Sequence, residues 1–366
     1  VDAKAALFHS LADELNASYT KFLRTSSTTH KEKVLQVWNQ LVDSGDIYLG
    51  KYCGWYSVRD EAFYDESEIS ADLLAPSDSP VEWVEEECYF FALSKFEKRL
   101  LDFYQENADF VLPGYRFNEV ISFVKSGLQD LAVSRSGITW GIPVPGNKEH
   151  VIYVWLDALT SYLSGADIWP ADVHVVGKDI LRFHAVYWPA FLMALNIDLP
   201  KHILSHGWWL NEGQKISKSV GNVIDPKLLI DEFGLDYIRY FLLREITLGS
   251  DGNFARINLV NRINSELCNK IGNLFQRVLA FIYKQFNGVI SFNCVDELYA
   301  QELLVTASKL PQTFNQHIKK FQLHYILDDI INLADQANKY IDEMAPWKLI
   351  KTDAAAAQRT LSTLLE

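Results

Sequence analysis

The sequence predicts an α/β protein: a doubly wound parallel sheet with a small β-rich insert, followed by a bundle of α-helices. Two observations support this prediction. Apolar runs at 151–155, 172–176 and 203–206 are separated by helical patterns, which is typical of buried parallel strands in an open sheet. Beyond residue 257, long amphipathic helical patterns follow one another without a strand signal of comparable length.

Composition excludes several classes of protein. The 366 residues suffice for two or three domains, and the net charge of −13 argues against a surface built for non-specific DNA binding. No apolar run reaches the roughly 18 residues of a membrane helix, so no membrane partner is expected. The four cysteines form no Cys-x-x-Cys pair, which favours the cytoplasm over a disulfide-bonded secreted protein. The start at Val1 has neither an initiator Met nor a signal-peptide pattern, so we expect the chain to begin within a longer protein.

The first 80 residues predict two helices and then short strands. Apolar residues recur at helical spacing in both halves of 1–45: first Phe8, Leu11 and Leu15, then Val34, Val37, Trp38 and Leu41. Residues 46–80 alternate β-type runs with acidic turns, which indicates a small β-rich insert.

The middle of the chain predicts the sheet and its connections. Helical patterns are expected at Tyr89–Tyr104 and Val120–Gly127, and an extended, proline-rich crossing at Trp140–Pro145. Val151–Trp155 and Asp172–Val176 are predicted as buried parallel strands, the second followed by a helix from Lys178 to about Leu195. Ile203–His206 is predicted as a third strand. No Gly-x-Gly-x-x-Gly occurs, which disfavours a nicotinamide or flavin enzyme.

A cationic loop follows the third predicted strand. Lys215-Ile-Ser-Lys-Ser219 lies between Gly213 and Gly221, so its backbone is free to bend. Lys215 and Lys218 present two ammonium groups close together, and Ser217 and Ser219 add hydroxyl donors for phosphate oxygens. The loop therefore suits a polyphosphate, the alternative being an ordinary solvated surface loop.

The helix predicted after Gly177 carries a second candidate site. Ile180, His184 and Trp188 have i, i+4, i+8 spacing and share one face. With Trp155 and Tyr162 they would line an aromatic pocket in which the histidine is a polar group. Such a pocket suits a thioether side chain. The alternative is a helix packed on the sheet with a satisfied core histidine.

Four motifs in this order closely resemble the methionyl-tRNA synthetases, which are class I aminoacyl-tRNA synthetases. They are Val154-Trp-Leu-Asp-Ala158, Val176-Gly-Lys-Asp-Ile180, Phe183-His184 with Trp188, and Lys215–Ser219. The resemblance extends from Gly54 to Trp347. It implies a Rossmann-like catalytic domain that forms methionyl-adenylate and pyrophosphate from L-methionine and ATP with Mg²⁺, and then transfers methionine to tRNA(Met).

The resemblance also implies roles for individual residues. The methionine-binding residues would be Trp155, Ala158, Tyr162, Ile180, His184 and Trp188, supported by an ion pair between Arg135 and Asp179. Lys215, Ser217, Lys218 and Ser219 would be catalytic, with ATP bound by Lys215, Lys218, His206 and Gly207. The anticodon would be bound by Asn273, Arg277 and Trp347, where Lys270, Arg277 and Lys284 form a basic strip without intervening acidic residues.

On this basis the predicted domains are five. They are the remainder of the first half of the nucleotide-binding fold (1–45), a connective insert (46–115), the second half of the catalytic domain (116–220), a linker that contacts the tRNA stem (221–256) and an α-helical anticodon-binding domain (257–366).

The sequence departs from the family in two places. The His-x-Gly-His motif that helps to bind ATP is absent, so we expect this chain alone to be inactive. Zinc is not expected in the insert, because Ser57 and Asp60 stand where relatives have cysteines and Cys53 is alone. Two alternatives remain: a non-catalytic tRNA-binding module, and another class I synthetase such as the cysteine enzyme, which would need zinc ligands not found here.

Overall fold

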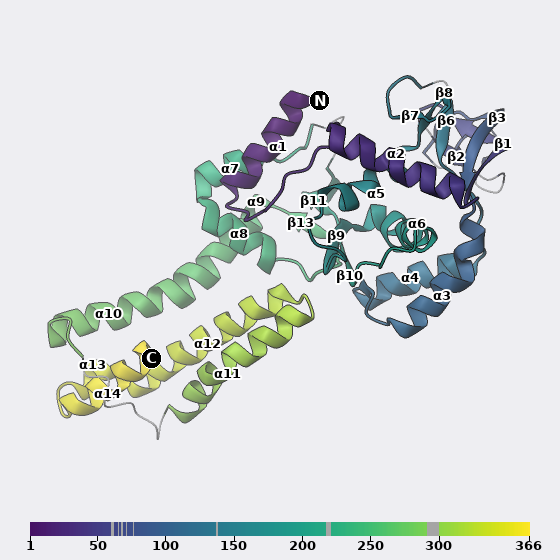
Figure 1. Ribbon diagram of the computed structural model, residues 1–366. Helices are drawn as coiled ribbons and strands as arrows, with labels where there is room; N and C mark the ends of the chain where they lie inside the picture. The colour runs from purple at the N-terminus through teal and green to yellow at the C-terminus, as the bar shows by residue number, and fades with distance from the viewer. Residues whose placement is uncertain are drawn as a thin grey trace. The chain divides into compact units, whose positions relative to one another are not determined.

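The computed structural model describes residues 1–59, 62–64, 66, 69–70, 72–75, 77–136, 138–216, 221–290 and 300–366 (Figure 1). The chain forms two compact units. One comprises Tyr19–Ser205, and the other joins Val1–Ser18 to His206–Glu366. The predicted site residues Ser217, Lys218 and Ser219 lie outside the described residues, as does Asp60.

The Tyr19–Ser205 unit mixes short strands with helices. Its elements are α2 (Thr28–Asp43), β1 (Ile47–Ser57), β2 (Ala62–Tyr64), β3 (Glu82–Phe91), the 3₁₀ turn η2 (Leu93–Phe96), α3 (Glu97–Glu106), β4 (Val111–Leu112), α4 (Gly114–Lys125), β5 (Leu131–Ala132), β6 (Ser134–Ser136), β7 (Pro143–Val144), β8 (Asn147–Ile152), α5 (Val154–Gly165), β9 (Val173–Gly177), the 3₁₀ turn η3 (Lys178–Ile180), the π-helical turn η4 (Phe183–Tyr187), α6 (Trp188–Ala194) and β10 (His202–His206), whose last residue belongs to the other unit.

The predicted β-rich insert is confirmed. Strands β2, β1, β3 and β5 form an antiparallel sheet in that order. The helix predicted from Tyr89 is wrong at its start, because Tyr89–Phe91 ends β3 and α3 begins only at Glu97. Strand pairing with β1 satisfies the backbone of these residues, which local helical periodicity alone could not reveal.

A second sheet has the order β4-β10-β9, with β10 parallel to β4. The strands predicted at 172–176 and 203–206 are confirmed as β9 and β10. The parallel strand predicted at Val151–Trp155 is wrong. Val151 and Ile152 end the antiparallel strand β8, and α5 begins at Val154. Five consecutive apolar residues are too few for periodicity to separate a buried strand from a helix start.

One hydrophobic core spans this unit. The predicted face of α2 (Val34, Val37, Trp38 and Leu41) is buried in it, as are Trp188 and Phe191 of α6. In Figure 1, α2 and α5 run side by side, and α3 lies beside α4. The second predicted helix thus supports the helix that carries Trp155.

The other unit is mostly helical. Its elements are α1 (Asp2–Glu14), β11 (Trp209–Asn211), β12 (Gln214–Lys215), α7 (Pro226–Phe233), α8 (Leu235–Arg244), β13 (Gly252–Phe254), α9 (Arg256–Arg262), the π-helical segment η5 (Ile263–Gly272), α10 (Asn273–Phe286), α11 (Gln301–Lys319), α12 (Leu323–Met344), α13 (Pro346–Leu349) and α14 (Ala354–Leu365).

The predicted helical bundle is confirmed: α10, α12 and α14 pack along one another (Figure 1) through Val278, Ile282, Ile341 and Leu361. The first predicted helix is also present as α1, but it contains no buried residue, and Phe8 on its predicted apolar face is exposed. Among helices of the described residues, none combines the length and apolar character needed to cross a membrane.

Candidate active site

Helix α5 carries three of the residues predicted to bind methionine. Tyr153 has extended backbone and precedes the first turn, which places Trp155 at the start of the helix and Tyr162 two turns later. The indole of Trp155 stacks on the ring of Phe183, with 3.8 Å between ring centroids and 10° between planes. Ala158 lies between Trp155 and Tyr162 on the same helix, so one helix supplies three of the predicted residues.

A hydrogen-bond relay joins α5 to the segment after β9. The Tyr162 hydroxyl lies 2.7 Å from Nε2 of His184, and Nδ1 of His184 lies 2.9 Å from the carbonyl oxygen of Ile180. A carbonyl oxygen only accepts, so Nδ1–H donates to Ile180 and Nε2 accepts from Tyr162. The structure thus brings together Trp155, Tyr162, Ile180 and His184.

Burial keeps this relay uncharged. It raises the pKa of Tyr162, and it lowers the pKa of His184, although the bond to the Ile180 carbonyl opposes part of that shift. Trp188 is fully buried with its ring centroid 6.0 Å from that of Tyr162. The cluster therefore presents aromatic surface and one neutral polar pair, which suits an uncharged, polarisable side chain.

The sequence reasoning missed three residues of the cluster. Phe183 stacks on Trp155, while His174 lies 4.0 Å from Tyr162 and 6.0 Å from Trp169, measured between ring centroids. Burial, followed by the electrostatic interaction with His184, lowers the pKa of His174 to about 4. The period-two alternation of β9, which turns His174 and Val176 inward, could have identified the histidine.

The predicted Arg135–Asp179 ion pair stays a prediction. Arg135, on β6, donates to the carbonyl oxygen of Ser134 at 2.8 Å, and its guanidinium carbon lies 4.3 Å from the centroid of the Tyr153 ring. Asp179 lies on the 3₁₀ turn η3 after β9. Both residues make further interactions.

Lys215 of the cationic loop is held by a tight hairpin. Strands β11 and β12 pair through Leu210 and Lys215, and the turn residues Glu212 and Gly213 both have positive φ, 49° and 80°. A two-residue hairpin turn of this kind requires left-handed backbone, which explains Gly213. The ammonium of Lys215 lies 4.6 Å from the centroid of the Trp208 ring. The turn and this cation–π contact orient the first lysine of the loop.

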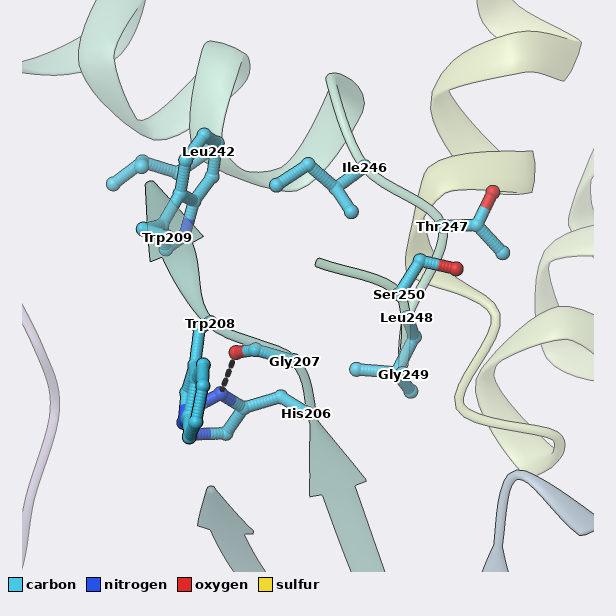
Figure 2. Close-up of a pocket in the computed structure, with 10 residues that line it drawn as sticks. All are labelled: His206, Gly207, Trp208, Trp209, Leu242, Ile246, Thr247, Leu248, Gly249 and Ser250. Carbon is cyan, nitrogen blue, oxygen red and sulfur yellow. Dashed lines mark hydrogen bonds between the residues drawn. The ribbon is translucent and has the colours of Figure 1, made fainter. Parts of the chain in front are cut away.

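His206 and Gly207 line a cavity of about 130 Å³ (Figure 2). His206 Nδ1–H donates to the Gly207 carbonyl oxygen at 2.8 Å. A Cβ at Gly207 would lie 2.1 Å from the carbonyl oxygen of Ser250, so only glycine fits at this position. Figure 2 shows residues 206–209 facing Leu242 and the loop 246–250 across the cavity. Two of the four predicted ATP-binding residues, His206 and Gly207, therefore line this cavity together with Trp208.

The three predicted anticodon residues lie in the helical bundle. Asn273 is exposed at the start of α10, and Arg277 follows one turn later. Ala345, with φ of 43°, ends α12, and Pro346 starts α13, which places Trp347 beside α10. The Arg277 guanidinium carbon lies 5.2 Å from the centroid of the Trp347 ring, and the indole remains 38% exposed. An arginine and a tryptophan thus form an accessible flat surface.

Acidic residues of α12 face the predicted basic strip. Lys270 pairs with Asp335 at 2.6 Å, and Arg277 pairs with Asp342. The two cations are seven residues apart and so are the two aspartates, so the two helices keep one register. These contacts orient Lys270 and Arg277 while offsetting much of their charge.

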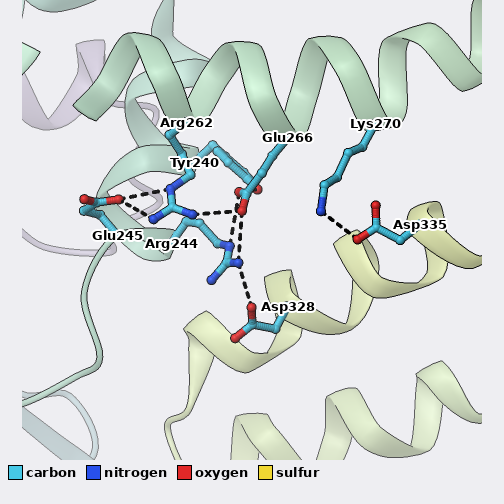
Figure 3. Close-up of polar contacts among 8 residues, drawn as sticks. All are labelled: Tyr240, Arg244, Glu245, Arg262, Glu266, Lys270, Asp328 and Asp335. Carbon is cyan, nitrogen blue, oxygen red and sulfur yellow. Dashed lines mark hydrogen bonds and ion pairs between the residues drawn. The ribbon is translucent and has the colours of Figure 1, made fainter. Parts of the chain in front are cut away.

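A partly buried network of ion pairs and hydrogen bonds lies between η5, α8, α9 and α12 (Figure 3). Glu266, on the π-helical segment η5, accepts hydrogen bonds from Tyr240, Arg244 and Arg262. Arg244 also pairs with Asp328 of α12 at 2.7 Å. These bonds hold the pKa of the Glu266 carboxyl below its ordinary value, against the opposing effect of its burial. One ionic cluster therefore joins four helical segments: α8, α9, η5 and α12.

Comparison with known proteins identifies the family. A family model described as "tRNA synthetases class I (M)" matches residues 1–73 and 72–279. The methionine–tRNA ligase of Rickettsia felis is 57% identical over 378 residues, covering 100% of this chain and 74% of that protein. The methionine–tRNA ligase of Brucella suis biovar 1 is 45% identical, covering 97% of this chain and 72% of its own length.

Solved structures agree. Mycobacterium tuberculosis methionyl-tRNA synthetase in complex with methionyl-adenylate matches with a TM-score of 0.89 at 44% identity, covering 98% of this chain and 74% of that one. The apo form of the same enzyme matches with a TM-score of 0.86 at 41% identity, covering 100% of this chain and 75% of that one. These matches confirm the predicted fold class. Since the likeness in both sequence and structure extends over nearly the whole chain, the chain belongs to the methionyl-tRNA synthetase family of class I aminoacyl-tRNA synthetases.

Proposed function

We propose that this protein activates L-methionine with ATP and transfers the methionyl group to tRNA(Met). The observation that carries the proposal is the neutral Tyr162–His184 pair inside the aromatic cluster. A thioether is weakly polar and polarisable, so it fits aromatic surface with one polar contact better than a charged or strongly polar side chain does. Family membership supports the same substrate.

In the first step, two anions, the methionine carboxylate and ATP, react, and a third anion, pyrophosphate, is released. The methionine carboxylate oxygen attacks the α-phosphorus of ATP, and the bond from that phosphorus to the bridging oxygen of the β-phosphate breaks, which gives methionyl-adenylate and pyrophosphate. Such a step depends on positioning and on charge stabilisation. The cluster on α5 and η4 holds the amino-acid side chain, and Lys215 and Lys218 stabilise the charge that develops on the leaving pyrophosphate.

ATP is proposed to enter as its Mg²⁺ complex. The metal belongs to the nucleotide substrate, and it neutralises phosphate charge that two lysines alone would leave uncompensated. His206 and Gly207 are proposed as further ATP contacts, supported by their place beside Trp208 and Lys215.

We further propose that Asn273, Arg277 and Trp347 read the anticodon in the second step. The indole of Trp347 can stack on an unpaired base, and Asn273 can hydrogen-bond a base edge. The Asp342 carboxylate and the Trp347 ring hold Arg277 in place. The methionyl group then passes from the adenylate to a hydroxyl of the terminal adenosine, and AMP is released.

We also propose that the insert holds no structural zinc and that the protein is cytoplasmic. The buried Ser57 hydroxyl is 2.8 Å from that of Ser79, an arrangement that offers no thiolate to zinc. Among the described residues, neither the buried Cys88 nor the exposed Cys268 is part of a disulfide, which favours a reducing compartment.

Amino-acid-dependent ATP–pyrophosphate exchange tests the proposed activity. The full-length protein is assayed with methionine, cysteine and leucine in turn. Exchange with methionine alone is expected, because the cluster offers neither a metal-thiolate contact for cysteine nor a purely apolar pocket for leucine. Exchange with cysteine or leucine but not with methionine would contradict the proposal, and no exchange at all would favour a non-catalytic tRNA-binding module.

Replacing Trp347 with alanine separates the two steps. Loss of one stacked base costs about 1–3 kcal/mol, so we expect tRNA charging efficiency to fall about 10- to 100-fold while pyrophosphate exchange is unchanged. Steady-state aminoacylation and exchange assays measure the two effects. Trp83→Ala is the matched control, because Trp83 is an exposed tryptophan of the insert. A loss of exchange in Trp347→Ala would instead assign Trp347 to packing.

A further inference from the structure

A buried histidine outside the predicted site fastens α5. His30, in the first turn of α2, has 0% exposure. Its Nε2 lies 2.6 Å from Oδ1 of Asp157, and its Nδ1 lies 2.8 Å from Oγ of Ser164. Both ring nitrogens of one imidazole are therefore bonded to the same neighbouring helix.

Each of the two contacts lies close along α5 to a proposed methionine-binding residue. Asp157 lies in the first turn of α5, two residues after Trp155, and Ser164 lies in the last turn, two residues after Tyr162. The bonded residues are seven apart, which is about two helical turns. A helix held at two points two turns apart resists both rotation about its axis and sliding along it.

The Tyr162–His184 bond depends on that restraint. The bond is 2.7 Å long and joins α5 to η4, which belong to different segments of the core. A hydrogen bond weakens steeply once its atoms separate beyond about 3.5 Å or lose alignment. Rotation of α5 by a few degrees would move both the Tyr162 hydroxyl and the Trp155 indole away from their partners.

We infer that His30 is a positioning residue for amino-acid recognition: by bonding Asp157 and Ser164 at once, it sets the rotation of α5 that places Tyr162 against His184. The inference rests on the proposed function, because α5 is the methionine-binding helix only if methionine is the substrate. His30 itself touches neither Trp155 nor Tyr162 through any hydrogen bond or ring contact that the described residues make.

Substitutions of His30 distinguish the effects of its hydrogen bonds to Asp157 and Ser164. His30→Phe keeps the volume of the ring and removes both hydrogen bonds. Because the Asp157 carboxylate accepts from Nε2–H, Nδ1 of the neutral ring accepts from the Ser164 hydroxyl. His30→Asn retains an amide oxygen that can accept near the Nδ1 position, and His30→Gln retains an amide N–H donor near the Nε2 position. His150→Phe is the matched control, because His150 is a histidine of the same unit with 4% exposure, bonded to Ser134 Oγ at 3.2 Å and packed edge-on against Tyr89.

The measurements are methionine affinity by equilibrium dialysis, KM for methionine and for ATP in pyrophosphate exchange, and the melting temperature. For His30→Phe we expect methionine affinity to fall about tenfold with the KM for ATP unchanged, since misplacing a contact by about 1 Å can cost up to about a hundredfold. The Asn and Gln variants should lie between His30→Phe and the wild type. His150→Phe should lose thermal stability but bind methionine normally.

Two results would overturn the inference. One is a His30→Phe protein that melts earlier yet binds methionine like the wild type, which would make His30 purely structural. The other is a parallel loss of methionine and ATP affinity. If His30→Phe does not fold, Asp157→Ala and Ser164→Ala remove the two hydrogen bonds one at a time, and unchanged methionine affinity in both variants would equally refute it. A wild type that neither binds nor exchanges methionine would refute the proposed function instead.

Discussion

Replacing His184 with alanine is expected to raise the KM for methionine about a hundredfold while the KM for ATP changes less than about twofold. The substitution removes the acceptor of the Tyr162 hydroxyl, and leaving a buried donor unpaired costs about 1–3 kcal/mol, where 1.4 kcal/mol is a factor of ten. It also opens space beside Trp155, whose ring centroid lies 6.2 Å from that of His184. Pyrophosphate exchange at varied methionine and varied ATP measures both constants.

Tyr162→Phe provides the companion measurement. It removes only the hydroxyl and keeps the ring that packs on His174 and Trp188, so we expect the KM for methionine to rise about tenfold, as for loss of a single hydrogen bond of about 1.4 kcal/mol. An equal rise in the KM for methionine and for ATP in either variant would argue against a methionine-specific role for the pair.

The same pair sets the expected pH dependence of methionine binding. The pKa of His184 is lowered, mainly by burial, so the neutral imidazole persists to more acidic pH than in a free histidine. Protonation of Nε2 removes the acceptor for the Tyr162 hydroxyl. Methionine affinity should therefore be constant above the ordinary histidine pKa of about 6.5 and fall only as the pH drops through the lowered value. The Tyr162→Phe variant should show a smaller fall.

Replacing Lys218 with alanine is expected to lower the rate of pyrophosphate exchange about 10²- to 10³-fold with methionine affinity unchanged. Removing one preorganised group that stabilises developing charge costs this much in comparable sites. The neighbouring Lys215 is oriented by the β11–β12 hairpin and by the Trp208 ring, and the second lysine follows three residues later. Presteady-state measurement of adenylate formation would isolate the effect on the chemical step.

The control for Lys218 is Lys227→Ala. Lys227 belongs to the same unit, and its ammonium is already paired with Glu14 at 3.1 Å on the surface. The Lys227→Ala variant should leave exchange unchanged, because solvent screens an ion pair on the surface and its loss has little effect on stability. A Lys218→Ala protein with normal exchange, or with equally reduced methionine affinity, would remove Lys218 from the proposed chemistry.

Much of the site could be predicted from the sequence because its residues are close along the chain. Ile180, His184 and Trp188 repeat at helical spacing, and the side chain of His184 bonds the carbonyl of Ile180 within that same segment. The Lys215–Ser219 motif likewise lies between two glycines that local turn chemistry requires. Trp155 was predicted on the wrong element, since a short apolar run fits both the end of β8 and the start of α5.

The sequence by itself determined local features: the buried face of α2, the spacing of Ile180, His184 and Trp188, and the order of the family motifs. Only the tertiary structure decided which segments meet: Tyr162 with His184, Arg277 with Trp347, and His30 with both ends of α5. The physical reason is that backbone geometry sets the spacing of neighbours within one helix or turn. A contact between residues 127 or 134 positions apart exists only because the whole core packs in one way.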